Sequence, residues 1–116
     1  MSTYKGIKGF KVQSFSADPV PTVAGWTAGG NLSTAKGNTA GAGTQTAGIL
    51  FGGNSDTSGT KTGTTEEYNG SAWADGGAMG TARYMHAGTG TQTAALAFGG
   101  YVSSNTNATE EYDGSS

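Results

Sequence analysis

Four glutamates are the side chains of this sequence best suited to acid–base chemistry. They form two adjacent pairs, Glu66–Glu67 and Glu110–Glu111, and paired carboxyl groups suggest glycoside hydrolysis. Adjacent residues of a strand point to opposite faces, however, so the two carboxyl groups of one pair cannot act on the same bond. Each pair also stands at the same place in a repeated stretch, as a structural motif would. We therefore expect the acid pairs to be structural and the protein not to be an enzyme.

His86 is the single histidine, and the sequence contains no cysteine. A metal site or a nucleophile–base pair would need further ligands or partners of these types, so we expect His86 to be structural. The stretch GNTAGAG (37–43) is glycine-rich like a phosphate-binding loop, but it lacks the Lys-Ser/Thr ending and a following helix. The sequence thus predicts no catalytic, cofactor-binding or metal-ligating residue, and no cofactor.

Short strands are the elements that would position these residues. The sequence predicts strands at 86–90, 94–100 and 108–112, with a turn at 91–93. The Asn-Gly dipeptide at 69–70 is a strong signal for a hairpin turn in which both residues have positive φ. No window has a helical period of apolar residues, and a helix rich in glycine and threonine would be costly. The expected fold class is all-β.

The chain repeats itself. Trp26 matches Trp73 at an offset of 47 residues, and Lys36 matches Arg83 at the same offset. After the glycine doublets the offset falls to 44, where a polar loop absorbs the deletion. The other matched segments are Gly29–Gly30 with Gly76–Gly77, Gly43–Ala47 with Gly90–Ala94, Phe51–Gly53 with Phe98–Gly100, and Thr65–Tyr68 with Thr109–Tyr112. A repeat of this length with four short strands has the size of one β-propeller blade.

The order of motifs within a repeat is more specific than its length. An apolar strand ending in Gly-Gly (ILFGG, 49–53) is followed by a loop and by a Tyr, a tight turn and a Trp (EEYNGSAW, 66–73). A Met, small residues and a basic residue come next (MGTAR, 79–83). This order resembles the kelch repeat, although Lys36 stands where arginine is usual. The resemblance covers residues 26–116 as two repeats, 26–72 and 73–116, and implies β-propeller blades.

The chain also looks like the kelch-like repeats in tail and fibre proteins of marine bacteriophages. This likeness implies a structural virion protein, a tail fibre or another tail or capsid appendage, that projects a kelch-like propeller for host-surface attachment. The alternative is a cellular kelch-type interaction module that binds a protein or a glycan. The variable loops 54–63 and 101–107 would lie on one rim, where they either bind a host-surface glycan or protein or simply connect strands.

Residues 1–25 stand outside the repeats as an N-terminal arm that ends in a proline-containing spacer. We expect residues 1–18 to dock onto other virion subunits, since they carry the apolar side chains Ile7, Phe10, Val12 and Phe15. The alternative is a frayed tail. The arm has no apolar run of the length found in a secretion signal, and no stretch approaches the roughly 20 apolar residues of a membrane span.

The charge balance argues against nucleic acid as a partner. The net charge is −2, and residues 26–116 carry three basic residues against seven acidic ones. Leu, Ile, Val and Phe together number only 13, so the few large apolar side chains must be used efficiently or shared with more protein. We expect Phe51, Phe98, Tyr68, Tyr112 and Trp73 to be largely buried at or between matching sheets.

The second repeat reaches its Tyr and its turn at the last residues of the sequence, before an equivalent of Trp73. Because a propeller needs about four to eight blades to close, two repeats alone would leave flat faces exposed. We expect further repeats after residue 116, with a fourth strand that completes the second unit. The alternative is a homo-oligomer, for instance three two-blade chains in a ring of six blades.

Overall fold

The computed structural model describes residues 25–55 and 57–115; most of the arm, including residues 1–18, lies outside this range. Within it the chain is all-β, which confirms the expected fold class. The seven strands are β1 (Ala40–Thr44), β2 (Ala47–Phe51), β3 (Thr65–Tyr68), β4 (Trp73–Asp75), β5 (Ala87–Thr91), β6 (Ala94–Phe98) and β7 (Thr109–Tyr112). The part of the chain described here has no helix long and apolar enough to cross a membrane.

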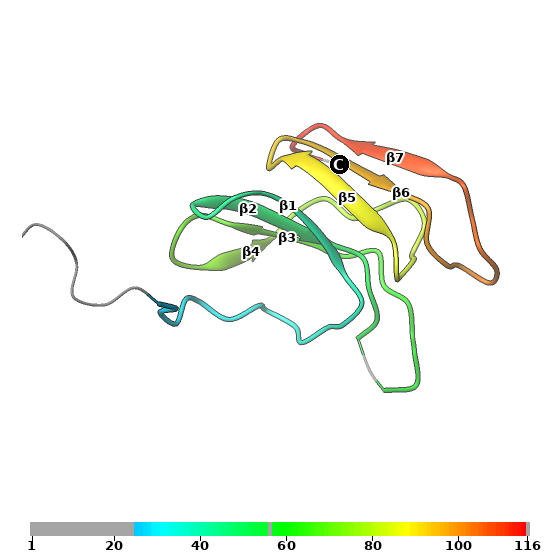
Figure 1. Cartoon of the computed structure of the whole chain (residues 1–116), viewed down its shortest axis with the longest axis horizontal. Helices are drawn as coiled ribbons and strands as arrows, with labels where there is room; N and C mark the ends of the chain where they lie inside the picture. The colour runs from blue at the N-terminus through cyan, green and yellow to red at the C-terminus, as the bar shows by residue number, and fades with distance from the viewer. Residues whose placement is uncertain (1–24, 56, 116) are drawn as a thin grey trace, which may run out of the picture.

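The strands form two antiparallel sheets, which Figure 1 shows one above the other. The first sheet has the order β1-β2-β3-β4 and the second has the order β5-β6-β7. Consecutive strands are neighbours, so each sheet is a simple meander. Corresponding strands pair in the same register: Phe51 lies opposite Thr65, as Phe98 lies opposite Thr109. The repeat in the sequence is thus a repeat in the structure.

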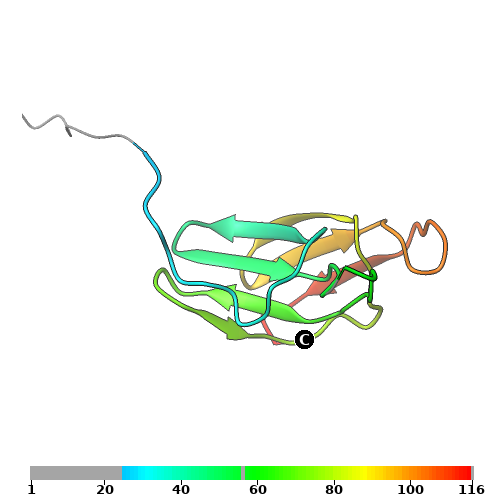
Figure 2. The same cartoon turned by 90° about the horizontal axis from the view of Figure 1, so that it is seen from below.

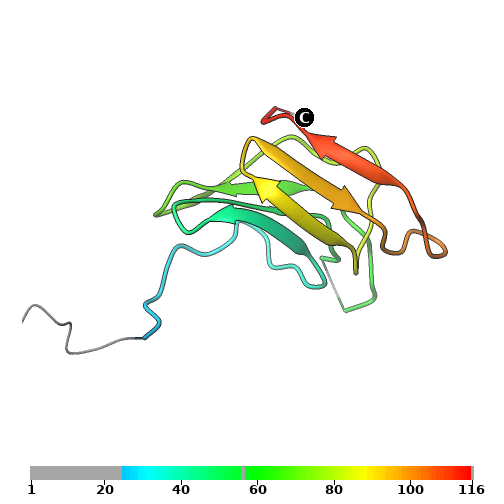
Figure 3. The ribbon, with the colours of Figure 1, turned by 45° about the horizontal axis from the view of Figure 1, so that its top comes forward.

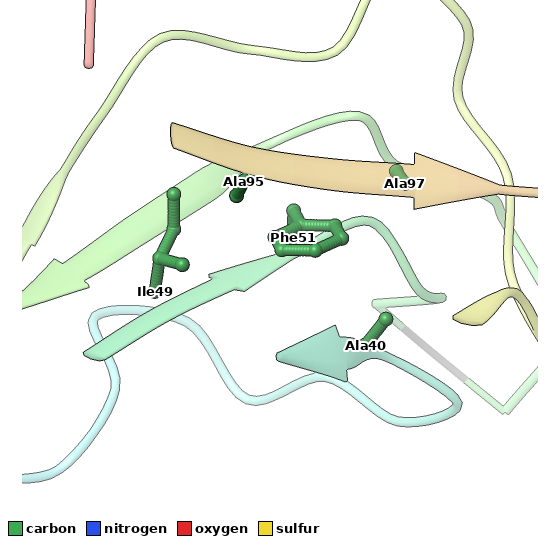
Figure 4. Close-up of a cluster of buried hydrophobic side chains, with 5 residues drawn as sticks. All are labelled: Ala40, Ile49, Phe51, Ala95 and Ala97. Atoms are coloured by element: carbon green, nitrogen blue, oxygen red, sulfur yellow. The ribbon is translucent and has the colours of Figure 1, made fainter. Parts of the chain in front are cut away.

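The two sheets pack face to face, with β1 against β5. Ile49 and Phe51 of the first sheet point toward Ala95 and Ala97 of β6, as Figure 4 shows, and Ala40 completes this core. Alanine on the facing side leaves room for the larger side chains, so the sheets interlock with few aliphatic residues. Phe51 is only 4% exposed.

Phe98 does not lie in the core as Phe51 does. The prediction that Phe98 would be largely buried was therefore wrong. Side chains alternate along a strand, so the face of β6 that carries Ala95 and Ala97 turns toward the first sheet, and Phe98 points to the opposite side. Phe98 is consequently 38% exposed. The aromatic residues Tyr68, Trp73 and Tyr112 are partly buried rather than largely buried. Trp73 packs on Tyr68, with ring centroids 4.9 Å apart.

The second sheet has three strands within the described residues, not four. Its last strand, β7, pairs with β6 on one side, and no strand of the described residues pairs with its other edge (Figure 3). In the first sheet the corresponding edge of β3 is paired with β4, where Tyr68 lies opposite Trp73.

A tight turn connects β3 to β4, but the expected two-residue Asn69-Gly70 turn was wrong: Tyr68 pairs with Trp73, and the Asn69 amide donates to the Ala72 carbonyl, so the connection spans residues 69–72. Gly70 has a φ of 101°, whereas Asn69 is not among the residues with positive φ. The Asn69 Oδ1 instead accepts hydrogen bonds from the amides of Ser71 and Ala72, both at 2.9 Å. This side-chain bond to the turn backbone takes over the role expected of the left-handed asparagine.

Candidate binding surface

The acid pairs of the sequence prove to be parts of the internal framework. Glu66 forms an ion pair with Lys36, with 2.9 Å between Oε2 and Nζ, and both side chains are 1% exposed. The Ser33 amide also donates to Glu66 Oε1 at 2.7 Å. Burial raises the pKa of the Glu66 carboxyl, but the Ser33 amide and Lys36 outweigh it and hold the pKa below its ordinary value. Glu66 is therefore a buried carboxylate that fastens the segment before β1 to β3.

The second sheet repeats this arrangement. Arg83 Nη2 lies 2.8 Å from Glu110 Oε2, and the amides of Gly80 and Thr81 donate to the Glu110 carboxylate at 2.7 and 3.1 Å. Glu110 is 27% exposed, unlike Glu66. The carboxylate in each sheet thus satisfies both a basic side chain and the backbone of the segment that precedes its sheet.

The structure explains why lysine can replace arginine in the first repeat. Arg83 Nη1 reaches the carbonyl oxygens of Gly99 and Ala108, at 3.0 and 2.8 Å, in addition to its glutamate. Lysine has no second nitrogen with which to do this, and Lys36 Nζ instead donates to the hydroxyl of Thr64 at 2.8 Å. Thr64 occupies the position of Ala108, so the hydroxyl supplies an acceptor within reach of the lysine.

The second acid of the first pair connects the two sheets. The Tyr112 hydroxyl donates to Glu67 Oε2 in a short hydrogen bond, and the Gly77 amide donates to the same hydroxyl at 3.3 Å. Burial and the Glu67 carboxylate raise the pKa of Tyr112. Glu66 and Glu67 therefore make different contacts, as adjacent strand residues must.

His86 is 9% exposed and packs against Phe51, with ring centroids 5.6 Å apart. Gly52 makes room for the ring, because a Cβ at that position would lie 2.4 Å from His86 Cε1. Burial and the Arg83 charge lower the pKa of His86, against smaller opposing effects of the Phe51 backbone and Glu110. The position is that of a packed neutral imidazole.

We expect the free energy of unfolding to decrease as the pH falls below about 6.5, the ordinary pKa of histidine. Because the folded pKa of His86 is lower, the unfolded chain takes up the proton first; stability is complete above this pH and is lost toward the folded pKa. Urea unfolding between pH 8 and pH 5 measures the loss. His86→Thr, which installs the residue found at equivalent position 39, should flatten this part of the profile; an unchanged profile would contradict the assignment.

The glycine-rich stretch 37–43 does not form an anion site. Gly37 makes a β-bridge with Asn54, and the residues from Ala40 onward belong to strand β1. No helix begins there, so the amides are engaged in the sheet rather than directed at a ligand. In residues 25–55 and 57–115, no group of three or more His, Cys, Asp or Glu side chains could hold a metal ion.

The two variable loops lie at the same end of the sheets, as Figure 2 shows. Loop 54–63 follows β2 and loop 101–107 follows β6. Each begins with a β-bridge to the segment before its sheet, from Asn54 to Gly37 and from Tyr101 to Tyr84. We call this end, with the loops and their bridged segments, the rim.

An apolar and aromatic patch stands on the rim in the second repeat. Tyr84 and Tyr101 pack edge to face, with ring centroids 5.6 Å apart. Met85 is 63% exposed and Tyr101 is also exposed. The positions equivalent to Met85 and Tyr101 in the first repeat hold Asn38 and Asn54, whose side-chain amides are joined at 2.8 Å. The Met85 amide donates to the Asn38 carbonyl at 3.0 Å, so the two rim segments are directly connected.

Met85 is held in an unfavourable backbone conformation. Its φ is 55° and that of Asn38 is 51°, and both lie in the left-handed region. Asparagine tolerates this region, but a long unbranched side chain such as methionine rarely occupies it. Strain of this kind is concentrated at functional sites, which favours the rim as the place where the chain binds something. Sequence reasoning identified the loops but not Tyr84 or Met85, because nothing in the sequence signals a left-handed methionine.

The sheets also enclose a cleft of about 350 Å³ on the side of their outer strands. Met79, Glu110 and Tyr112 line it together with Phe51. It opens because the sheets touch at β1 and β5 and diverge toward β3 and β7. Among the residues that line it, Glu110 and Tyr112 already make the structural contacts described above.

Comparison with known proteins gave no match, either to a protein-family model or to a curated protein.

Proposed function

We propose that this chain is a structural protein of a bacteriophage particle, a tail fibre or another tail or capsid appendage, which attaches to the host surface and is not an enzyme. Each sheet is a kelch-like propeller blade in this proposal. Residues 1–18, outside the described range, anchor the chain to other virion subunits. The rim faces outward and contacts a glycan or a protein of the host.

The repeated ion pairs support the blade interpretation. Lys36–Glu66 and Arg83–Glu110 join equivalent positions in the two repeats, and each buries a basic side chain. Equivalent ion pairs in two neighbouring sheets are expected of a stacked repeat, because each unit packs its strands and its leading segment in the same way. These contacts also engage one glutamate of each acid pair, Glu66 and Glu110, which supports a binding role over a catalytic one.

The rim patch is the observation that carries the attachment role. Tyr84, Met85 and Tyr101 present aromatic and apolar surface beside the amides of Asn38 and Asn54. Tyrosines provide large contact area at a low entropic cost and are enriched at sites that dominate binding energy. Amides provide directional hydrogen bonds to polar ligands such as sugars.

The test of attachment is binding of the fluorescently labelled chain to intact cells of the bacterium that the particles infect. We expect Met85→Asn combined with Tyr101→Ser to weaken binding at least about tenfold. The fold should be retained, because asparagine suits the left-handed backbone and is the residue at equivalent position 38. Ala72→Ser, in the β3–β4 turn at the opposite end of the sheets, is the matched control. Equal binding by all three proteins would refute attachment through the rim.

A second experiment separates the virion role from that of a cellular interaction module. Mass spectrometry and immunogold labelling of purified particles should find the protein in the particle. Its presence only in the soluble fraction of the host would favour the cellular module and contradict the virion proposal.

A further inference from the structure

The residues that join the two sheets have equivalents on the outer faces of the sheets, where no second sheet of the described chain contacts them. Inside the chain, Phe51 packs over Gly88, where a Cβ would lie only 2.4 Å from Phe51 Cζ. The equivalent of Phe51 is Phe98, on the outer face of the second sheet, and the equivalent of Gly88 is Gly41, exposed on the outer face of the first sheet. No side chain approaches the space above Gly41 within the described residues. A large ring and the glycine that could accept it are thus exposed on the outer faces of the second and the first sheet, respectively.

A glutamine shows the same relation. Gln92 Nε2 donates to two carbonyl oxygens of the first sheet, those of Gly48 at 3.0 Å and Tyr68 at 2.8 Å. These residues lie opposite each other in the β2–β3 ladder. Gln45, the equivalent of Gln92, is exposed on the outer side of the first sheet. The equivalent carbonyl groups belong to Ala95 and Tyr112, which lie opposite each other in the β6–β7 ladder.

The tyrosine–glutamate contact between the sheets is duplicated as well. Tyr112 donates its hydroxyl to Glu67 inside the chain. The equivalents are Tyr68 in the first sheet and Glu111 in the second, and Glu111 is exposed. The side chain of Glu111 is therefore in the place where a tyrosine from a following sheet could reach it.

The unpaired edge of β7 completes the pattern. In the first sheet, Trp73 of β4 pairs with Tyr68 and packs on its ring. The equivalent of Trp73 is Trp26, which is fully exposed and belongs to no strand. By the same register, residues 26–28 would pair with Glu110–Tyr112 as the fourth strand of a second sheet.

We propose that a second copy of this chain docks on the outer face of the second sheet. The copy lays its residues 26–28 along β7 as a fourth strand and packs its first sheet on Phe98. Its Gln45 then donates to the carbonyl oxygens of Ala95 and Tyr112 of the first copy, and its Tyr68 donates to Glu111.

The occupant is a second copy because every group the surface needs is present on this chain, at the position that the internal interface dictates. The interface also has a compatible shape. Where the internal face offers Ala95 and Ala97, the outer face of the first sheet offers Gly48 and Leu50, so a smaller and a larger residue replace two alanines.

The contact is head to tail, since it joins two different faces. Such an interface repeats from copy to copy and produces a closed ring if the rotation allows it. With two sheets from each copy and about four to eight blades per propeller, a ring contains about two to four copies. This inference does not depend on attachment to a host, and either can fail without the other.

Sedimentation of the 116-residue chain provides the first test. We expect an assembly of two to four copies rather than an 11.5 kDa monomer. Gln45→Glu should weaken association about tenfold, because a carboxylate cannot donate to the two carbonyl groups. Thr57→Glu, which adds the same charge in loop 54–63, should leave association unchanged.

Mixing of two blocked variants tests the head-to-tail geometry. Trp26→Ala combined with Gln45→Glu blocks the outer face of the first sheet, and Phe98→Asp blocks the outer face of the second sheet. If the far-UV circular dichroism of Phe98→Asp shows that this variant does not fold, Glu111→Lys replaces it. Each variant alone should sediment as a monomer, and an equimolar mixture should form a dimer with one intact interface. A monomeric wild type would overturn the proposal and leave the face to a further repeat of a longer chain. Variants that fail to pair when mixed would overturn it in favour of a symmetric contact.

Discussion

Replacing Lys36 with methionine should lower the free energy of unfolding by about 3–5 kcal/mol. The change leaves the Glu66 carboxylate buried with the Ser33 amide but without its cation. A buried charge that loses its partner costs far more than the pair itself contributes, since the desolvation of the carboxylate is no longer offset. Urea unfolding at pH 7, monitored by tryptophan fluorescence, measures the loss.

Two controls separate this effect from a simple loss of packing. Replacing both partners, as in Lys36→Met with Glu66→Leu, should recover much of the stability because no buried charge remains. Glu110→Gln in the second sheet should cost less than Lys36→Met, because Arg83, the buried charge left behind, still donates to the carbonyl oxygens of Gly99 and Ala108. If the double variant were as unstable as the single one, the charge argument would be wrong.

Phe51→Ala should be comparably damaging, with a loss of about 3–5 kcal/mol. The ring is the largest apolar side chain of the core and lies between Ala40, Ala95 and Ala97. These alanines are too small to fill the cavity that its removal leaves, and His86 would lose its packing partner. Chemical denaturation again provides the measurement.

Phe98→Ala is the matched control, because it removes the same ring from the equivalent position. Under dilute, monomeric conditions we expect it to cost less than half as much as Phe51→Ala, since Phe98 is 38% exposed. Equal losses would show that the second sheet buries its outer face within one chain, contrary to the packing described here.

The strands could be predicted from the sequence because the repeat supplies each signal twice. The apolar run ending at Phe51 and its copy ending at Phe98 both became strands, and the polar stretches between them became loops. The structural role of Glu66 and Glu110 also follows from their common place in the repeats. The alternation of side chains along a strand was sufficient to predict that Glu66 and Glu67 point to opposite faces of their sheet.

The outcome for Phe98 depended on which neighbour it has, and a repeat pattern cannot supply that information. Equivalent residues share a local environment only where equivalent units lie on both sides, and Phe98 has none within the described residues. The pairing of Lys36 with Thr64 also escaped prediction, because it substitutes a side-chain acceptor for backbone carbonyls. The left-handed Met85 contradicts its own intrinsic preference, so tertiary contacts must impose it.

The contacts of each repeat fall into two groups that have different consequences for folding. The ion pairs Lys36–Glu66 and Arg83–Glu110 lie within one sheet and its leading segment, whereas the Gln92 and Tyr112 hydrogen bonds cross between sheets. Stability then has an intrinsic part for each unit and a coupling part for each neighbouring pair. Cooperativity resides in the second part, so folding that begins in either unit spreads to the next through the shared core around Phe51 and through the hydrogen bonds of Gln92 and Tyr112. A gene segment that encodes such a unit can be duplicated without any new type of contact, since each added unit carries both the donor groups and the acceptor groups of the contacts between sheets.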